Sequence, residues 1–288
     1  MRSIALLLLC LAGLVFAVMP AHAARSYDGC TAFITSVPTV VNSPGVYCMN
    51  QDLATSITSG DAISILGSNI TIDCNDFRLD GIAAGAGTTA VGIFGQFDDN
   101  ITVRNCNVRG FQRGIDLEVP NFSGAANYLV EDNHLDANTG TGIIVTGDYS
   151  IVRRNVVLDT GGSTAASGIS AAANVDVSDN TISGVSTQAG SGEAAYGIKL
   201  TSNTWGTVRH NRIDGIVTSA SGLSVGISTD IRRGIIRDNI LTGPGTSSSQ
   251  GITCASFDNE PMRDNVVQGF AFTTLGGCAD AGGNDFQP

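Results

Sequence analysis

Apolar residues recur along most of the chain in one short phrase, apolar-x-x-Asn-x-apolar, as in Val177-Ser178-Asp179-Asn180-Thr181-Ile182. Apolar and polar positions alternate with a period of two in and around the phrase, which predicts short β-strands rather than helices. The step between successive copies varies, and is shorter from Asn133 to Asn155 than from Asn180 to Asn211. The asparagines of the phrase are Asn75, Asn133, Asn155, Asn180, Asn211, Asn239 and Asn265, and Cys106 takes the Asn place in one further copy.

A second phrase, Gly-Ile, precedes most of these asparagines by a nearly constant distance, as Gly168-Ile169 precedes Asn180. The stretch from each Asn to the next Gly-Ile is much more variable. It is short from Asn133 to Gly142 and much longer from Asn180 to Gly197. The copies are therefore one structural unit whose length variation is confined to one corner.

A unit of this size holds only two or three strands, which are too short to form a stable sheet alone. Stacking the units places equivalent strands side by side in parallel, about 4.8 Å apart, and buries the inward Val, Ile and Leu in columns. The recurrent asparagines, each at a bend between two strands, are then predicted to form an internal ladder of side-chain amides. The pattern predicts a parallel β-solenoid.

The copy that runs from Asp99-Asn100-Ile101-Thr102-Val103-Arg104 to Gly114-Ile115-Asp116-Leu117 resembles the right-handed parallel β-helix repeats of the pectin-lyase-like superfold. The resemblance covers the chain from about position 60 to position 280. It implies an all-β, right-handed parallel β-helix of about eight to nine rungs with a short N-terminal cap. It leaves the function open, because this fold hosts lyases, hydrolases, epimerases, adhesins and phage spikes.

The segment 1–23 has the features of an export signal. Arg2 begins a positive segment, Ile4 to Val18 is apolar, and Ala21-His22-Ala23 is a small-x-small cleavage site. We therefore expect a periplasmic or secreted protein with no membrane span after cleavage. The expected organisation is a signal peptide over 1–23, a cap and partial first rung over 24–60, and the β-helix domain over 61–288.

Export to an oxidising compartment predicts disulfides among the remaining cysteines. Cys254 and Cys278 are about one rung apart in the sequence and are predicted to close the C-terminal end. Cys48 could pair with Cys74 or with Cys30. Cys106 is offset from Cys74 and stands at a ladder position, so it is predicted to be a buried thiol.

Charge narrows the range of partners. Only 14% of residues are charged and the net charge is −11, which becomes −12 when Arg2 is removed with the signal. A nucleic-acid-binding protein would need clustered Lys and Arg, so that class is excluded. The expected partner is a polysaccharide or a cell-envelope glycan.

In families with this fold the substrate lies along the first strand column, which here is the Gly-Ile strand. Lys199, the sole lysine, stands in this column and could abstract a proton α to a uronate carboxylate. The simpler interpretation is a surface cation paired with Asp230, one rung on. Both residues are candidate substrate-binding groups.

Asp116 and Glu118 lie two residues apart on one Gly-Ile strand, so both are predicted to face outward. Paired carboxylates could bind the substrate, hold a calcium ion, or act as acid and base in hydrolysis. The simpler interpretation is a solvated strand with Arg113 nearby. Trp205, the sole tryptophan, lies in a turn and is either a sugar-stacking platform or a packing residue.

The leading hypothesis is an exported β-helix protein that binds a carbohydrate polymer along the Gly-Ile strand face. The catalytic version of this hypothesis is a calcium-assisted polysaccharide lyase. The alternative is a non-catalytic envelope, matrix or adhesion protein that uses the solenoid as a rigid interaction surface. The sequence carries no known catalytic motif of the fold that would decide between an enzyme and a binding protein.

Overall fold

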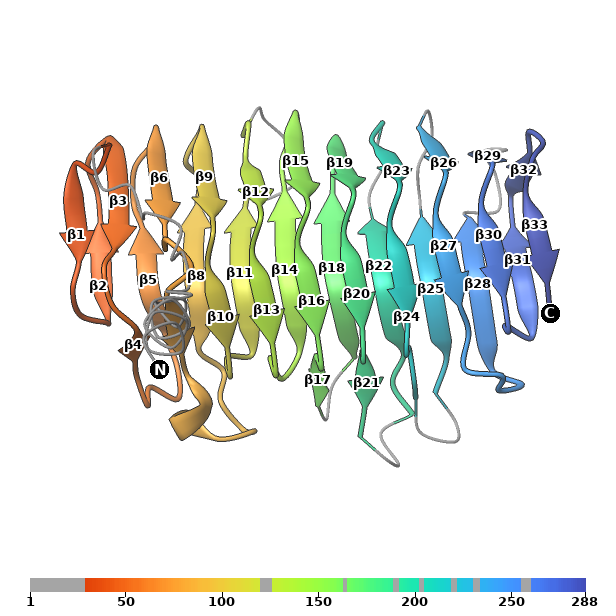
Figure 1. The fold of residues 1–288 in the computed structure, drawn as a ribbon, viewed down its shortest axis with the longest axis horizontal. Helices are drawn as coiled ribbons and strands as arrows, with labels where there is room; N and C mark the ends of the chain where they lie inside the picture. Colours follow the sequence, from red (N-terminus) through yellow and green to blue (C-terminus); the bar gives the residue numbers. More distant parts are fainter. Residues whose placement is uncertain are drawn as a thin grey trace, which may run out of the picture.

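The computed structural model describes residues 29–288 apart from 120–125, 163–164, 189–191, 202–204, 219–221, 230–233 and 255–259. The chain winds into an elongated solenoid whose turns are stacked along one axis (Figure 1). Each turn contributes one strand to each of three parallel sheets, which we name A, B and C. This arrangement confirms the predicted all-β parallel β-helix. The predicted signal peptide over 1–23 lies outside the described residues.

Sheet A contains β1 (Ala32–Ile34), β3 (Gly45–Met49), β6 (Ile70–Asp73), β9 (Ile101–Arg104), β12 (Leu129–Glu131), β15 (Ser150–Arg153), β19 (Val175–Ser178), β23 (Thr207–Arg209), β26 (Ile235–Arg237), β29 (Glu260–Arg263) and β32 (Cys278–Asp280). Sheet B contains β2 (Thr39–Val41), β5 (Asp61–Ile65), β8 (Val91–Gln96), β11 (Arg113–Glu118), β14 (Thr141–Thr146), β18 (Ala166–Ala172), β22 (Ala195–Thr201), β25 (Ser224–Thr229), β28 (Ser249–Cys254) and β31 (Phe272–Gly276). Sheet C contains β4 (Leu53–Ala54), β7 (Arg78–Asp80), β10 (Asn107–Arg109), β13 (His134–Asp136), β16 (Val156–Leu158), β20 (Thr181–Ser183), β24 (Arg212–Asp214), β27 (Ile240–Thr242), β30 (Val266–Gln268) and β33 (Asp285–Gln287).

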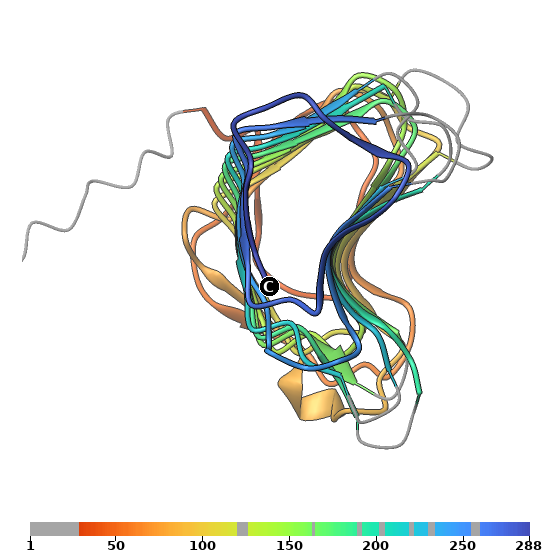
Figure 2. The same ribbon diagram turned by 90° about the vertical axis from the view of Figure 1, so that its right-hand side faces the viewer.

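Along the chain, each turn passes through sheet B, then A, then C, as β8, β9 and β10 do. Seen along the axis in Figure 2, the sheets form three walls around the core, and the right-hand wall, sheet B, curves inward. Short strands β17 (Gly161–Gly162) and β21 (Ser186–Thr187) pair at the corner between sheets C and B, and the 3-10 helix η1 (Ile82–Ala84) lies at the same corner nearer the start of the solenoid. No helix among the described residues has the length and apolar character needed to cross a membrane.

The isoleucines of the Gly-Ile phrase form one column of the core. They pair in register from strand to strand of sheet B, and each is completely buried. The column consists of Ile63, Ile93, Ile115, Ile143, Ile169, Ile198, Ile227 and Ile252. The Gly-Ile phrase therefore repeats in the sequence because its isoleucines stack in one apolar column.

A glycine precedes each of these isoleucines except Ile63, which follows Ala62, and close packing between rungs favours the glycine. A Cβ placed on Gly197 would lie 2.6 Å from the carbonyl oxygen of Gly226 on the next rung and 2.5 Å from Ile213 Cγ2 inside the core. The ladder pairing skips this glycine. As a result, the residue before Gly and the residue after Ile both face outward, as Tyr196 and Lys199 do, where they contact each other.

The asparagine ladder is confirmed at the bend between sheets A and C. Asn180 Oδ1 accepts hydrogen bonds from the backbone N–H and the side-chain amide of Asn155, and its own Nδ2 donates to the Val152 carbonyl. The same pattern joins the buried side chains of Asn133, Asn155, Asn180, Asn211, Asn239 and Asn265, and Asn284 extends it by one step.

Cys106 and Asn75 were predicted to stand at the start of the ladder. Cys106 occupies a ladder position as predicted, since its backbone N–H donates to Asn133 Oδ1. The prediction for Asn75 was wrong: it has φ +48° and donates to the Met49 carbonyl instead. The reason is that the four-residue turn after β6 places Asn75 three positions before β7, whereas each ladder asparagine directly precedes its sheet C strand.

Three disulfides join the six cysteines of the described chain. Cys254–Cys278 is confirmed, and Cys30–Cys48 is one of the two alternatives left open for Cys48. The prediction that Cys106 is a free thiol was wrong, because it is bonded to Cys74 with their Cα atoms 4.6 Å apart. The longer turn after β6 also explains this pairing, since it shifts Cys74 toward the ladder position of the next rung. The domain boundary at residue 60 stays a prediction.

Candidate functional site

The outward side of sheet B, which we call the B face, is the surface predicted to carry the site. Its central column is formed by the residue after each isoleucine, in register from strand to strand. The column reads Ser64, Phe94, Asp116, Ile144, Ser170, Lys199, Ser228, Thr253 and Leu275. Hydroxyl side chains therefore occupy four of these positions. The inward curve of sheet B places the column along a concave wall (Figure 2).

Asp116 faces outward on β11 as predicted, but its side chain is completely buried. Its neighbours in the column are Phe94 and Ile144, and Arg113 on the same strand donates a hydrogen bond to Oδ2. Oδ1 is buried without a hydrogen-bond partner among the described residues. Burial raises the pKa of Asp116 from 3.8 to about 7, with the positive charge of Arg113 opposing the rise and Glu118 adding to it.

The calcium site predicted at Asp116 and Glu118 is not supported by this geometry. A calcium ion takes six to eight oxygen ligands from carboxylates, carbonyls and water, whereas Asp116 is enclosed and paired with Arg113. Glu118 lies one outward position further on and is flanked in register by Gln96 and Thr146. Among the described residues, no group of three or more His, Cys, Asp or Glu is arranged to hold a metal ion.

Lys199 also lies on the B face, on β22, with its Nζ 4.8 Å from the centre of the Tyr196 ring. Three strand spacings separate it from Asp116 along the axis. The structure therefore places the two residues on one surface without bringing them to one reacting bond. Asp230, the predicted partner of Lys199, lies outside the described residues.

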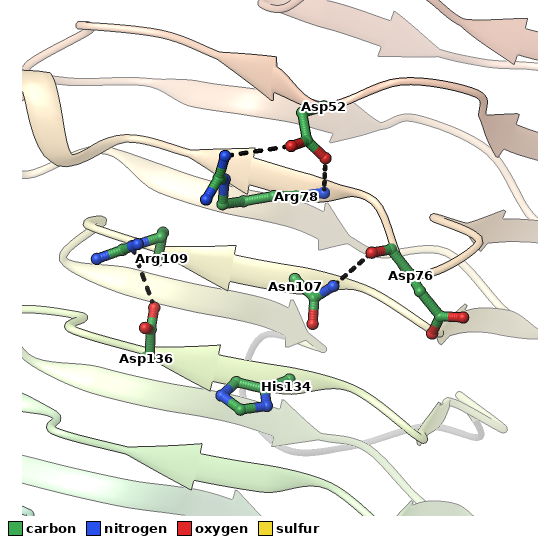
Figure 3. A pocket seen from close by; sticks show the side chains of 7 residues that line it. All are labelled: Asp52, Asp76, Arg78, Asn107, Arg109, His134 and Asp136. Atoms are coloured by element: carbon green, nitrogen blue, oxygen red, sulfur yellow. Dashed lines mark hydrogen bonds and ion pairs between the residues drawn. The ribbon is translucent and has the colours of Figure 1, made fainter. Parts of the chain in front are cut away.

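A hollow of about 300 Å³ lies on another wall, over the first strands of sheet C (Figure 3). Arg78 pairs with Asp52 at 3.1 Å, and Arg109 pairs with Asp136 at 3.3 Å. Its lining consists of Asp52, Asp76, Arg78, Asn107, Arg109, His134 and Asp136. The lining residues come from four successive rungs.

The sheet C hollow was not predicted from the sequence. Asn107 and His134 directly follow ladder positions, and each faces outward next to the other in register. A sequence signal was present, because the residue after the ladder asparagine or cysteine is polar at Asn107 and His134 and becomes apolar at Val156 in the next copy. The ladder phrase predicted the inward asparagines, whereas the hollow is formed by outward residues that follow them.

The NosD family model, described as "Periplasmic copper-binding protein (NosD)", matches residues 26–215, about two thirds of the chain. The chain belongs to the NosD family. This family of periplasmic β-helix proteins agrees with the predicted fold class and with a periplasmic or secreted location.

Copper, which the family description names, does not fit the residues that the structure describes. Copper sites in proteins use His, Cys and Met side chains. All six described cysteines are in disulfides, and Met49 and Met262 are buried in the core. His134 and His210 belong to different turns, and no suitable cluster is present among the described residues.

Two solved structures share the overall course of the chain at low similarity. The crystal structure of the Dettilon tailspike protein (gp208) is 13% identical, with a TM-score of 0.40, and the match covers 88% of this chain and 59% of that one. The Azotobacter vinelandii mannuronan C-5 epimerase AlgE4 A-module is 12% identical, with a TM-score of 0.35, and the match covers 90% and 85%. The NosD chain thus spans about three fifths of the tailspike chain. No curated protein matches it.

Proposed function

We propose that this NosD-family protein binds an extended glycan chain along its B face without cleaving it. The observation that supports the proposal most is the central column of the B face, in which Ser64, Ser170, Ser228 and Thr253 repeat a hydroxyl group along a concave wall. The column crosses nine of the ten stacked strands of sheet B. A surface of this length suits a polymer rather than a small molecule.

The spacing of the rungs gives a physical reason for a glycan. Adjacent strands are about 4.8 Å apart, which is close to the length of one pyranose unit in an extended chain. A glycan parallel to the axis would therefore meet an equivalent strand position at each sugar, and a hydroxyl side chain at four of the nine positions. Hydroxyl and amide side chains both donate and accept hydrogen bonds, as sugar hydroxyls require.

Binding without cleavage follows from the state of the two candidate catalytic groups. Lys199 Nζ lies over the Tyr196 ring, 4.8 Å from its centre, a contact that holds this side chain against its own strand. Asp116 is enclosed and paired with Arg113, out of reach of a substrate. We therefore assign both residues to shaping the surface and do not propose a calcium-assisted lyase.

The second candidate function is that of a rigid envelope, matrix or adhesion protein. It is favoured by the net charge of −11, which opposes the approach of acidic polysaccharides. In that case the solenoid would present a stiff surface to another protein, and no glycan would be retained. The two functions are separated by direct binding measurements.

The test is retention of the exported protein on immobilised glycans, with a double variant Ser170→Glu and Ser228→Glu on the B face. The glycans are cellulose, chitin, alginate and polygalacturonate. We expect retention on at least one, and a loss of at least tenfold in the double variant. No loss is expected in the control double variant Thr181→Glu and Ile240→Glu, which puts the same two charges on sheet C. Absence of retention on all four would contradict glycan binding. A rise in ultraviolet absorbance from unsaturated products would contradict binding without cleavage.

A further inference from the structure

Two exposed aromatic side chains stand at equivalent corners between sheets B and A. Tyr149 is 67% exposed and Trp205 is 56% exposed. Ser150 pairs with Val175, and Val177 pairs with Val208, so Ser150 and Gly206 occupy equivalent positions in sheet A. Tyr149 and Trp205 directly precede these two residues. One rung lies between them. Their separation along the axis is therefore two rungs, or about 10 Å.

Both corners are held in place by contacts between rungs. Asp148, beside Tyr149, accepts a hydrogen bond from the Asn174 N–H at 3.2 Å through its side chain. Beside Trp205, Gly206 packs so closely on the rung below that a Cβ there would lie 1.9 Å from the Val175 carbonyl oxygen. The two aromatic residues therefore project from backbone whose position is fixed by stacking.

The row extends toward the N-terminal end. Phe97 follows β8 at the same corner, two rungs before Tyr149, and is 72% exposed. The residue equivalent to Tyr149 on this rung is Asn100, so Phe97 lies three residues nearer to sheet B. Among the described residues, exposed aromatic side chains thus stand at three corners between sheets B and A. Scattered exposed apolar residues need no explanation, but aromatic residues aligned on one edge of a polar surface indicate a binding surface.

We infer that Tyr149 and Trp205 are stacking platforms for the glycan of the proposed function, and that they bind alternate sugars of an uncharged, extended chain. This inference rests on the proposed function. The two-rung spacing is close to the length of two linked pyranose rings, so one face of every second ring would meet an aromatic side chain. Aromatic rings offer the apolar surface that a sugar face can cover.

The charge at these corners favours an uncharged chain. Asp98 and Asp99 follow Phe97 directly, and Asp148 precedes Tyr149. Burial raises the pKa of Asp98, but its neighbour Asp99 is exposed. A chain of uronate residues running past these carboxylates would be repelled. A neutral β-linked glycan meets no such cost.

Trp205 is the only tryptophan, so its fluorescence reports on this corner alone. The experiment titrates the exported protein with cello-oligosaccharides and chito-oligosaccharides of two to six sugars, and with alginate oligosaccharides of the same lengths. We expect a shift of the emission with the neutral oligosaccharides. We also expect affinity to rise at least tenfold between the disaccharide and the hexasaccharide, because only the longer chain spans both rings.

Calorimetry on Tyr149→Ala and Trp205→Ala measures the contribution of each ring. We expect at least a tenfold loss of hexasaccharide affinity in each, and no loss in Ile240→Ala, which removes an exposed apolar side chain from sheet C. Circular dichroism checks that the variants are folded.

Retention on a glycan with unchanged Trp205 emission and unchanged affinity in both alanine variants would overturn the stacking role and leave the proposed function standing. Tighter binding of alginate oligosaccharides than of neutral ones would overturn the preference for an uncharged chain. Failure of every glycan in both assays would overturn the proposed function together with this inference.

Discussion

Asp116 occupies an outward position of a strand and is nevertheless completely buried. Its burial arises from the residues stacked on either side, Phe94 and Ile144, and from the inward curve of sheet B. The period-two alternation correctly predicts the direction of the side chain. It does not predict how far the neighbouring side chains cover Asp116, because these neighbours come from other copies of the repeat.

The stability of the protein is therefore expected to depend on pH through Asp116. Its pKa of about 7 in the folded protein lies above its ordinary value of 3.8, so the folded state holds this proton more tightly than the unfolded chain between those two values. The free energy of unfolding contributed by this group is highest below about pH 4 and falls as pH rises toward 7.

Replacing Asp116 with Asn should remove this dependence. The variant should gain stability relative to the native protein as pH rises from 4 to 7, by up to about 4 kcal/mol. Urea unfolding at several pH values measures the difference. Glu118→Gln, on the same strand, removes a charge that adds to the rise, so it should reduce the slope without abolishing it. Parallel pH profiles for native protein and Asp116→Asn would contradict the raised pKa.

The corners between strands decide which asparagines join the ladder. With two residues between the strands, as in most turns, the Asn side chain points inward and lies under its counterpart on the next rung. In the four-residue turn after β32, Asn284 still joins the ladder because it directly precedes β33, whereas Asn75 stands three positions before β7 and does not. A second buried asparagine, Asn138 at the corner between sheets C and B, accepts from the Phe111 N–H and donates to the Val108 carbonyl. It occurs once, so no repeat revealed it.

Asn180→Ala should lower the free energy of unfolding by about 1–3 kcal/mol, because the Asn155 amide groups and the Val152 carbonyl lose a buried partner. Thr181→Ala changes the next residue, which faces outward from sheet C, and should have an effect below about 0.5 kcal/mol. Thermal or urea unfolding measures both. Equal effects of the two substitutions would argue against a stabilising ladder.

In the whole molecule each turn contacts only its neighbours, so stability is expected to be local and the ends to be the weakest parts. The disulfides are placed accordingly. Cys30–Cys48 and Cys74–Cys106 join the first turns, and Cys254–Cys278 joins β28 to β32 near the last. The last strand of sheet B, β31, is largely exposed, which leaves it dependent on that bond.

Removal of the last disulfide should therefore loosen one end only. In the double variant Cys254→Ala and Cys278→Ala, hydrogen exchange should increase over β31 to β33 and remain native over β8 to β14. A link that closes a loop of this size contributes about 3 kcal/mol. The matched control is Cys30→Ala with Cys48→Ala, which should loosen β1 to β3 instead. Uniformly faster exchange along the chain would contradict local stability.

Much of the fold was predictable because it is repetitive. The Gly-Ile column, the ladder from Asn133 to Asn265 and the Cys254–Cys278 bond each follow from residues that recur at one rung spacing. Asn75 and the Cys74–Cys106 bond were mispredicted because one turn is two residues longer. At the candidate site, the strand positions of Asp116 and Lys199 were correctly predicted. Trp205 was named as one of two alternatives, a stacking platform or a packing residue, whereas its alignment with Tyr149 and the sheet C hollow were not foreseen.

The sequence by itself determined the stacking of the turns, the inward columns and the direction of each outward side chain, because these depend on local alternation and on the repeat. Only the tertiary structure decided what the outward residues meet. It enclosed Asp116 between Phe94 and Ile144, set Lys199 on the Tyr196 ring, and aligned Tyr149 with Trp205 two rungs apart. Most of these contacts join residues from different turns, and the lengths of the intervening corners control which residues become neighbours.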